Sequence, residues 1–257
     1  MAMPGREANY GKPWSRNELI LAFDLYCRIP FQRTKASNPE VRKLATILDR
    51  SPASVARKLG NFGAFDPELR KRNISGLQHG SRLDRAIWDE FHQDWNTLVL
   101  EASKLLVSLS GTPIKETLEL PVGPSERLAT ARQRIHQSFF RDAVLSSYEN
   151  RCCITGISIP ECLIASHIVP WRADERFRAD PTNGLCLSST FDRLFDSGLL
   201  TVTTELDVCL SKRLLGISKG PVHELICRYH KQPILPPRRF APETARLKWH
   251  RENVFIE

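Results

Sequence analysis

The sequence lacks any uninterrupted apolar run of the roughly 20 residues that a membrane-spanning helix needs. Its opening residues, MAMPGREANYGKPW, contain no apolar core of the kind found in secretory signals. Internal repeats and low-complexity tracts are missing as well. Hydrophobic residues make up 41% of the 257 residues, enough for folded cores and for two ordinary domains. We therefore expect a folded cytoplasmic protein that makes no use of a membrane.

The sequence also lacks the paired Cys-x-x-Cys knuckles that are typical of structural zinc sites. Cys152 and Cys153 are adjacent, and Thr155 stands where a second knuckle cysteine would be. The total of seven cysteines is odd, and a cytoplasmic compartment keeps thiols reduced. These features favour buried, apolar cysteines over a zinc cluster.

Acidic residues are few relative to basic ones: 29 Asp and Glu against 37 Lys and Arg give a net charge of +8. Such a balance suits a polyanionic partner, because neutralising phosphates releases counterions. The clearest case is the helix-like stretch from Arg127 to Arg141, which also holds Arg132 and Arg134 and contains no acid in between. We expect these four arginines to contact nucleic acid.

Prolines and glycines cluster in SLSGTPIKETLELPVGPS and interrupt the helical periodicity. We therefore expect a helical domain over residues 1–104, a linker over 105–125 and a second domain over 126–257. The fold class implied is α+β, with a helical first domain and a second domain of mixed helices and strands.

The helical domain contains the outline of a helix-turn-helix. A helix is expected from Pro39 to Leu48, and Ser51 then caps a second helix that has Pro52 at its first position. This second helix carries Arg57 and Lys58. The pair either contacts DNA, as recognition helices do, or is a solvated pair at the corner of a helical bundle.

The second domain contains two expected strands, over 151–156 and 163–171, followed by a polar loop and the short apolar run 185–187. A helix is expected over 191–196, ended by Gly198. A hairpin follows, turning near residues 204–205. Strands and a helix around one histidine form a compact ββα unit.

Three segments carry a family resemblance: ASHIVPW, PTNGLCL and FDRLFDSGLL. Together they resemble the HNH nucleases, whose ββα-metal fold the second domain would then share. The lead-in RQRIHQSFFRDAVLSSYENRCCITG is similar to the subgroup found in bacterial restriction endonucleases, which often carry an N-terminal helical domain.

The resemblance implies roles for single residues. His167 would be the general base that activates water, and Asn183 would lie in the loop that orients it. Asp192 would bind the metal, and Asp196, four residues later, either binds metal or caps the end of the helix. Carboxylates are hard oxygen ligands, so we expect Mg²⁺ or Mn²⁺ and, less so, Zn²⁺. His250 either approaches this site or closes the fold.

Many HNH sites have an aspartate immediately before the base, whereas this sequence has Ser166. The expected function is a metal-dependent endonuclease that hydrolyses DNA, in restriction or phage defence. The alternatives are a DNA-binding regulator on a degenerate HNH fold and an RNA-directed or toxin-like nuclease. A homodimer is a further expectation, since cutting both strands together needs two active sites.

Overall fold

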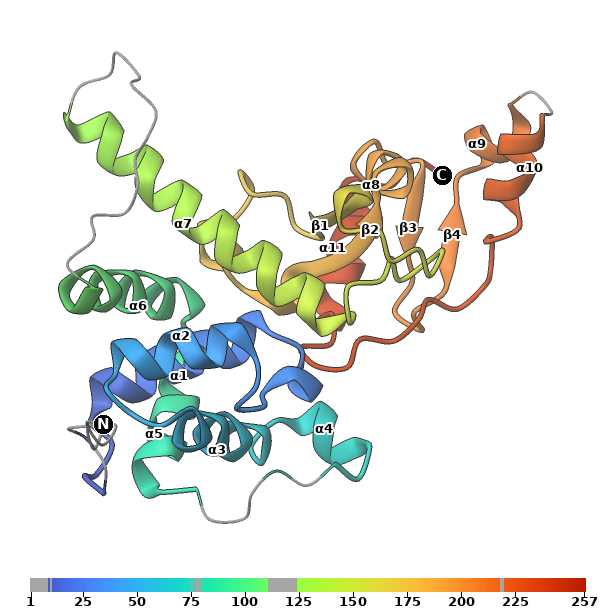
Figure 1. Ribbon diagram of the computed structural model, residues 1–257. Coiled ribbons are helices and arrows are strands. Elements are labelled where there is room, and N and C mark those ends of the chain that lie inside the picture. Colours follow the sequence, from blue (N-terminus) through green and yellow to red (C-terminus); the bar gives the residue numbers. More distant parts are fainter. Residues whose placement is uncertain (1–8, 10, 75, 77–79, 111–123, 218–219) are drawn as a thin grey trace. The chain divides into compact units, whose positions relative to one another are not determined.

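The computed structural model describes all residues except 1–8, 10, 75, 77–79, 111–123 and 218–219. Its elements are, in chain order, α1 (Arg16–Arg28), η1 (Phe31–Arg33), α2 (Pro39–Ile47), α3 (Pro52–Gly63), α4 (Pro67–Lys71), α5 (Arg82–Phe91), α6 (Trp95–Ser110), α7 (Pro124–Ser147), η2 (Pro160–Cys162), β1 (Leu163–His167), η3 (Glu175–Phe177), η4 (Pro181–Asn183), β2 (Gly184–Ser188), α8 (Ser189–Asp196), β3 (Leu200–Val202), β4 (Val208–Leu210), α9 (Lys212–Gly216), α10 (Pro221–Cys227) and α11 (Thr244–Asn253). The chain is therefore of mixed α and β structure (Figure 1), as the expected helices and strands predict. No helix among the described residues is long and apolar enough to cross a membrane.

The chain forms two compact units, residues 1–142 and 143–257. The division lies inside helix α7, because Phe139 packs against Trp95 of the first unit and Ser147 accepts a hydrogen bond from the Arg238 backbone of the second. The expected domain start, residue 126, lies in the same helix. Of the expected linker over 105–125, residues 105–110 continue α6, and most of the rest lies outside the described residues.

The first unit is organised around α1, which packs against α2, α3, α5 and α6 (Figure 1). Its start is fixed locally by a capping box, in which Ser15 and Glu18 each bond the backbone of the other. The core is aromatic, with Phe23 contacting the rings of Phe62 and Trp88. Such rings bury large apolar areas and account for much of a small helical core.

Helices α2 and α3 are joined by the four residues 48–51 and pack against each other. Asn38 caps α2 and Ser51 caps α3, each followed by proline at the first helical turn. Two consecutive helices therefore lie where the sequence predicts them.

The second unit is built on a two-stranded antiparallel sheet, β1 with β2, and a small hairpin, β3 with β4. Helix α8 packs on β1, β2 and β3, and α11 packs on β3 (Figure 1). The backbone after α8 turns at Gly198, which has φ +71°. The Ile256 N–H donates to the Gly198 carbonyl, so the last residues hold this turn in place.

One sequence prediction of secondary structure is wrong. Residues 151–156 form a turn rather than a strand, and β1 instead pairs with 184–188. Helices α5 and α6 are separated at residues 92–94, where Asp94 accepts hydrogen bonds from the backbone N–H and the hydroxyl of Thr97 and so starts α6.

Candidate active site

The sheet β1–β2 places His167 and Asn183 at one end. In its register His167 lies opposite Gly184, the residue after Asn183. The Ile168 N–H donates to the Asn183 carbonyl at 2.8 Å and extends the ladder beyond the strand. The loop 168–183 therefore leaves and re-enters the sheet at the same end. His167 lies just before the loop and Asn183 at its last position, so the two residues are neighbours.

His167 turns from the end of β1 toward this loop. Its Nε2 lies 3.2 Å from the carbonyl oxygen of Arg178, and its ring meets Trp171 edge to face, with centroids 5.6 Å apart. Because a carbonyl can only accept, this contact places a proton on Nε2 and the lone pair of a neutral ring on Nδ1. Burial lowers the pKa of His167 from 6.5 to about 4, opposed by the contact with Arg178. The imidazole is therefore neutral at neutral pH.

Asn183 is fully buried and ties the two arms of the loop together. Its Oδ1 accepts from the Val169 N–H at 2.9 Å, and its Nδ2 donates to the Val169 carbonyl at 3.0 Å and to that of Phe177 at 3.4 Å. Val169 is two residues from His167, and Phe177 is next to Arg178, which holds the imidazole. This geometry fits a positioning residue, because the side chain of Asn183 bonds the loop backbone on both sides of the histidine.

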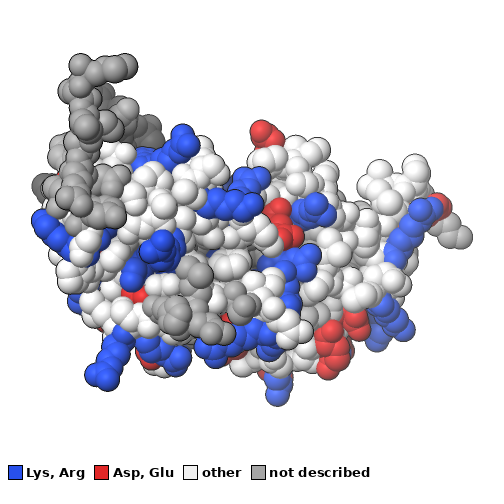
Figure 2. Space-filling view, turned by 60° about the horizontal axis from the view of Figure 1, so that its bottom comes forward, with Lys and Arg blue, Asp and Glu red and all other residues white. Residues whose placement is uncertain are grey.

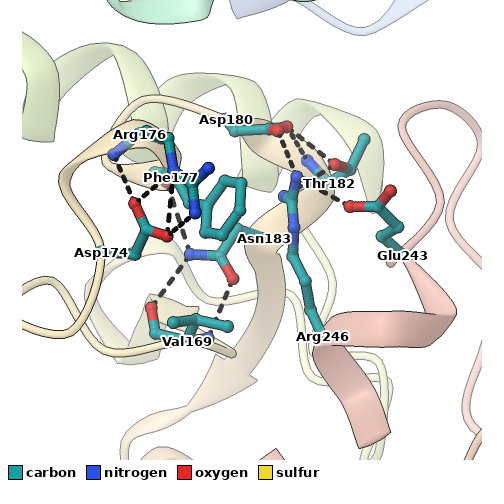
Figure 3. A network of polar contacts seen from close by, with 9 residues as sticks. All are labelled: Val169, Asp174, Arg176, Phe177, Asp180, Thr182, Asn183, Glu243 and Arg246. Carbon is teal, nitrogen blue, oxygen red and sulfur yellow. Dashed lines mark hydrogen bonds and ion pairs between the residues drawn. The ribbon is translucent and has the colours of Figure 1, made fainter. Parts of the chain in front are cut away.

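A second side chain that holds the loop in place comes from α11, and it was not predicted from the sequence (Figure 3). The buried Arg246 guanidinium bonds Asp180 at 2.6 Å and the Thr182 hydroxyl at 2.9 Å, and it also pairs with Glu243. It lies over the Phe177 ring, 4.1 Å from the centroid. Nothing in the local sequence links these residues, since 64 positions separate Arg246 from Thr182.

The two carboxylates of α8, Asp192 and Asp196, are one helical turn apart and so lie on the same face. Burial raises the pKa of both, and the charge of Asp192 raises that of Asp196 further, while Arg193 opposes both shifts. Asp192 is partly buried and Asp196 is exposed, and a cation bound beside them would offset the negative charge that Asp192 imposes on Asp196.

The residue before the histidine, Ser166, lies beside Asp192. Its hydroxyl lowers the pKa of Asp192, which places it close to that carboxylate. Ser166 is 3% exposed, and its Oγ has no partner at regular hydrogen-bond distance and angle. The end of β1 therefore presents the buried hydroxyl toward α8 and the imidazole toward the loop.

His250 packs against α8 and β3. It is buried, its ring stacks on Phe195 with centroids 3.7 Å apart, and its Nδ1 lies 2.9 Å from the Thr201 hydroxyl. Of the two roles considered for His250, its contacts support closing the fold.

Residues 152–203 match the family model of the HNH endonucleases. No curated protein matches the chain. The HNH segment, as we call residues 152–203, runs from the turn before β1 to the end of β3 and contains His167, Asn183, Asp192 and Asp196. The match supports nuclease activity in general for this segment, and nucleic acid, DNA in particular, as its substrate.

The donor set of the HNH segment fits a hard divalent cation better than a soft one. Carboxylate and hydroxyl oxygens are the groups that gather at α8 and the end of β1, and oxygen ligands suit Mg²⁺ and Mn²⁺. Across the described residues, no three His, Cys, Asp or Glu side chains converge as a complete ligand set. Metal binding by Asp192 and Asp196 therefore needs oxygens from other groups.

The buried cysteines of the second unit are free thiols. Burial raises the pKa of the Cys153 thiol, and the neighbouring Cys152 and Cys186 raise it further. Thiolates, rather than thiols, bind zinc, so this apolar packing opposes metal binding.

The predicted nucleic-acid contacts differ in their surroundings. Arg132, Arg134 and Arg141 are exposed on α7, and Arg57 is exposed on α3. The side chain of Arg127 lies outside what the structure describes. Figure 2 shows Lys and Arg side chains spread over one face of the molecule, with acidic side chains in few places.

Lys58 is placed differently from its neighbour Arg57. Its side chain is 11% exposed, and its ammonium group lies 2.9 Å from the fully buried carboxylate of Asp84 and 5.3 Å from the centre of the Trp14 ring. Asn61 also donates to Asp84 at 3.0 Å. In this arrangement the charge of Lys58 compensates a buried carboxylate.

Proposed function

We propose that the protein is a metal-dependent endonuclease that hydrolyses DNA phosphodiester bonds. One observation carries the proposal: within the HNH segment, a neutral imidazole is fixed through Nε2 by the Arg178 carbonyl, and the residue before the histidine, Ser166, has its hydroxyl beside the Asp192 carboxylate of α8. Phosphodiester hydrolysis needs a base for water and a cation for the phosphate, and these groups would supply both.

His167 acts as the general base in this proposal. With Nε2–H directed at Arg178, the Nδ1 lone pair takes the proton from the attacking water. Such help is worth roughly 10²–10⁴-fold in rate. Asn183 keeps the lone pair in place by fixing the loop backbone on both sides of the ring.

Asp192 and Asp196 would hold Mg²⁺ or Mn²⁺. The bound ion would neutralise charge on the phosphate and on the leaving 3′ oxygen. The raised pKa values of both carboxylates support this role, because a cation beside them would favour their charged forms and would offset the effect of the Asp192 charge on Asp196.

DNA would be gripped by the arginines of α7 and by Arg57 of the helix-turn-helix-like pair α2–α3. Support comes from the exposure of Arg132, Arg134 and Arg141 on a stretch without acids between residues 127 and 141. A setting in restriction or phage defence follows from the sequence resemblance to restriction-type nucleases, and a homodimer from the need to cut two strands.

The seven cysteines are all free, which supports a reducing compartment such as the cytoplasm as the place of action.

Incubation of plasmid DNA with the protein and Mg²⁺ or Mn²⁺ tests the proposal. We expect nicked and linear products, lost on addition of a chelator and in His167→Ala. Tight sequence-specific binding without cleavage under any divalent metal would instead support the regulator on a degenerate HNH fold, for which the serine at position 166 is the argument. Parallel digestion of DNA and RNA distinguishes an RNA-directed enzyme.

A further inference from the structure

Ser166 has a buried hydroxyl that contributes nothing evident to folding. It is fixed in the β1–β2 ladder opposite Leu185, and its Oγ is shielded from solvent. Buried hydroxyls normally find a partner, because an unpaired one loses its hydration without compensation. The carboxylate of Asp192 is its polar neighbour, and no regular hydrogen bond joins them. A hydroxyl in this state beside the Asp192 carboxylate, one helical turn from Asp196, has the placement of a ligand oxygen.

We infer that Ser166 supplies a third, neutral oxygen to the cation site of Asp192 and Asp196, and that this site reaches full affinity only together with the phosphate of bound DNA. The inference rests on the proposed function and adds the ligand set and the coupling between the two ligands.

The charge of the site is the reason for the coupling. Two carboxylates carry two negative charges, and the hydroxyl of Ser166 adds an oxygen without a third. Affinity for divalent cations falls as the number of charged ligands decreases, and Mg²⁺ is commonly held by one or two carboxylates together with substrate phosphates. A DNA phosphate brings the missing anion, so metal and DNA should each strengthen binding of the other by the same factor.

The fold offers a way to separate a ligand role from a structural one. If the Ser166 hydroxyl has no partner within the protein, Ser166→Ala removes a desolvated polar group and leaves the metal-free melting temperature equal or higher, by about 2–4 °C. The same variant should bind metal more weakly. Stability and metal affinity would then change in opposite directions, which loss of a structural hydrogen bond cannot produce.

The experiment uses the full chain carrying His167→Ala, which keeps DNA intact. Free Mn²⁺ is measured by electron paramagnetic resonance, and affinity for a 20-base-pair duplex is measured by fluorescence anisotropy at constant ionic strength, with and without Mn²⁺. We expect Mn²⁺ to tighten DNA binding roughly 5–150-fold. Ser166→Ala should weaken Mn²⁺ binding at least about tenfold, and Ser166→Asp should strengthen it without DNA and shrink the DNA coupling.

Ser188→Ala is the matched control, since this half-buried serine lies at the opposite end of the same sheet, paired with Leu163. It should leave Mn²⁺ affinity and coupling unchanged. The inference is overturned if Ser166→Ala retains Mn²⁺ affinity, if Mn²⁺ has no effect on DNA affinity, or if Ser166→Ala lowers the metal-free melting temperature. Asp192→Asn tests the metal site itself. If this variant still binds Mn²⁺, the proposed site is refuted. If Asp192→Asn abolishes Mn²⁺ binding but Ser166→Ala leaves it unchanged, only the inference about Ser166 is refuted.

Discussion

Replacing Asn183 with alanine should both loosen the second unit and disable the base. The change removes three hydrogen bonds of a fully buried side chain and leaves the N–H and the carbonyl of Val169, itself 5% exposed, without their partner. An unsatisfied buried polar group costs about 1–3 kcal/mol, so two such groups give a loss of about 2–6 kcal/mol in the free energy of unfolding. For a unit of this size the melting temperature should fall by roughly 8–20 °C.

Differential scanning calorimetry measures this loss, and plasmid cleavage below the lowered transition measures the effect on chemistry. We expect kcat to fall while DNA affinity is kept, because Asn183 bonds the loop around His167 and not the arginine-bearing helices. Asn253→Ala is the control: this exposed asparagine makes one bond, to the Trp249 carbonyl, and its loss should cost less than about 0.5 kcal/mol. A stable, fully active Asn183→Ala protein would refute the reasoning.

Three further predictions follow. In a pH–rate profile, the loss of kcat/KM on the acid side should have its midpoint below pH 6.5, because burial lowers the pKa of His167 to about 4 and the base stays neutral until the pH falls toward that value. A midpoint at pH 6.5 or above would contradict this. Tyr148→Phe should keep or raise the melting temperature, since the buried phenol hydroxyl has no hydrogen-bond partner among the described residues, and a clear drop would contradict this. Lys58→Ala should destabilise the first unit by about 3–5 kcal/mol in urea unfolding, because it leaves the buried Asp84 carboxylate without its cation. Arg57→Ala should leave the stability unchanged and should weaken DNA binding with a smaller salt dependence. Equal stabilities of the two variants would refute the distinction between these residues.

Local signals were sufficient for much of the first unit. The Ser51–Pro52 start of α3 is decided by neighbours in the chain, so the sequence predicts it correctly. The break between α5 and α6 at residues 92–94 is set by Asp94, which starts a new helix although the apolar pattern continues through the break. Periodicity reports which face is buried and says little about where one helix ends.

The pairing of the strands could not be predicted from the sequence. Residues 151–156 have an apolar, strand-like composition, yet β1 pairs with 184–188, so this stretch is left as a turn. Pairing depends on which segments meet in space, and several short apolar runs compete for the same partner.

The sequence by itself determined the identity of the candidate site, because His167, Asn183, Asp192 and Asp196 stand in motifs that can be read along the chain. The tertiary structure decided what those residues contact. It directs Nε2 of His167 to the Arg178 carbonyl, commits Asn183 to Val169 and brings Arg246 to the loop from a helix more than 60 positions away. It also separates Lys58 from Arg57, although the two are adjacent in the chain. The physical reason is that burial and hydrogen bonding depend on neighbours in space, and these set the proton position, the pKa and the free charge of each group.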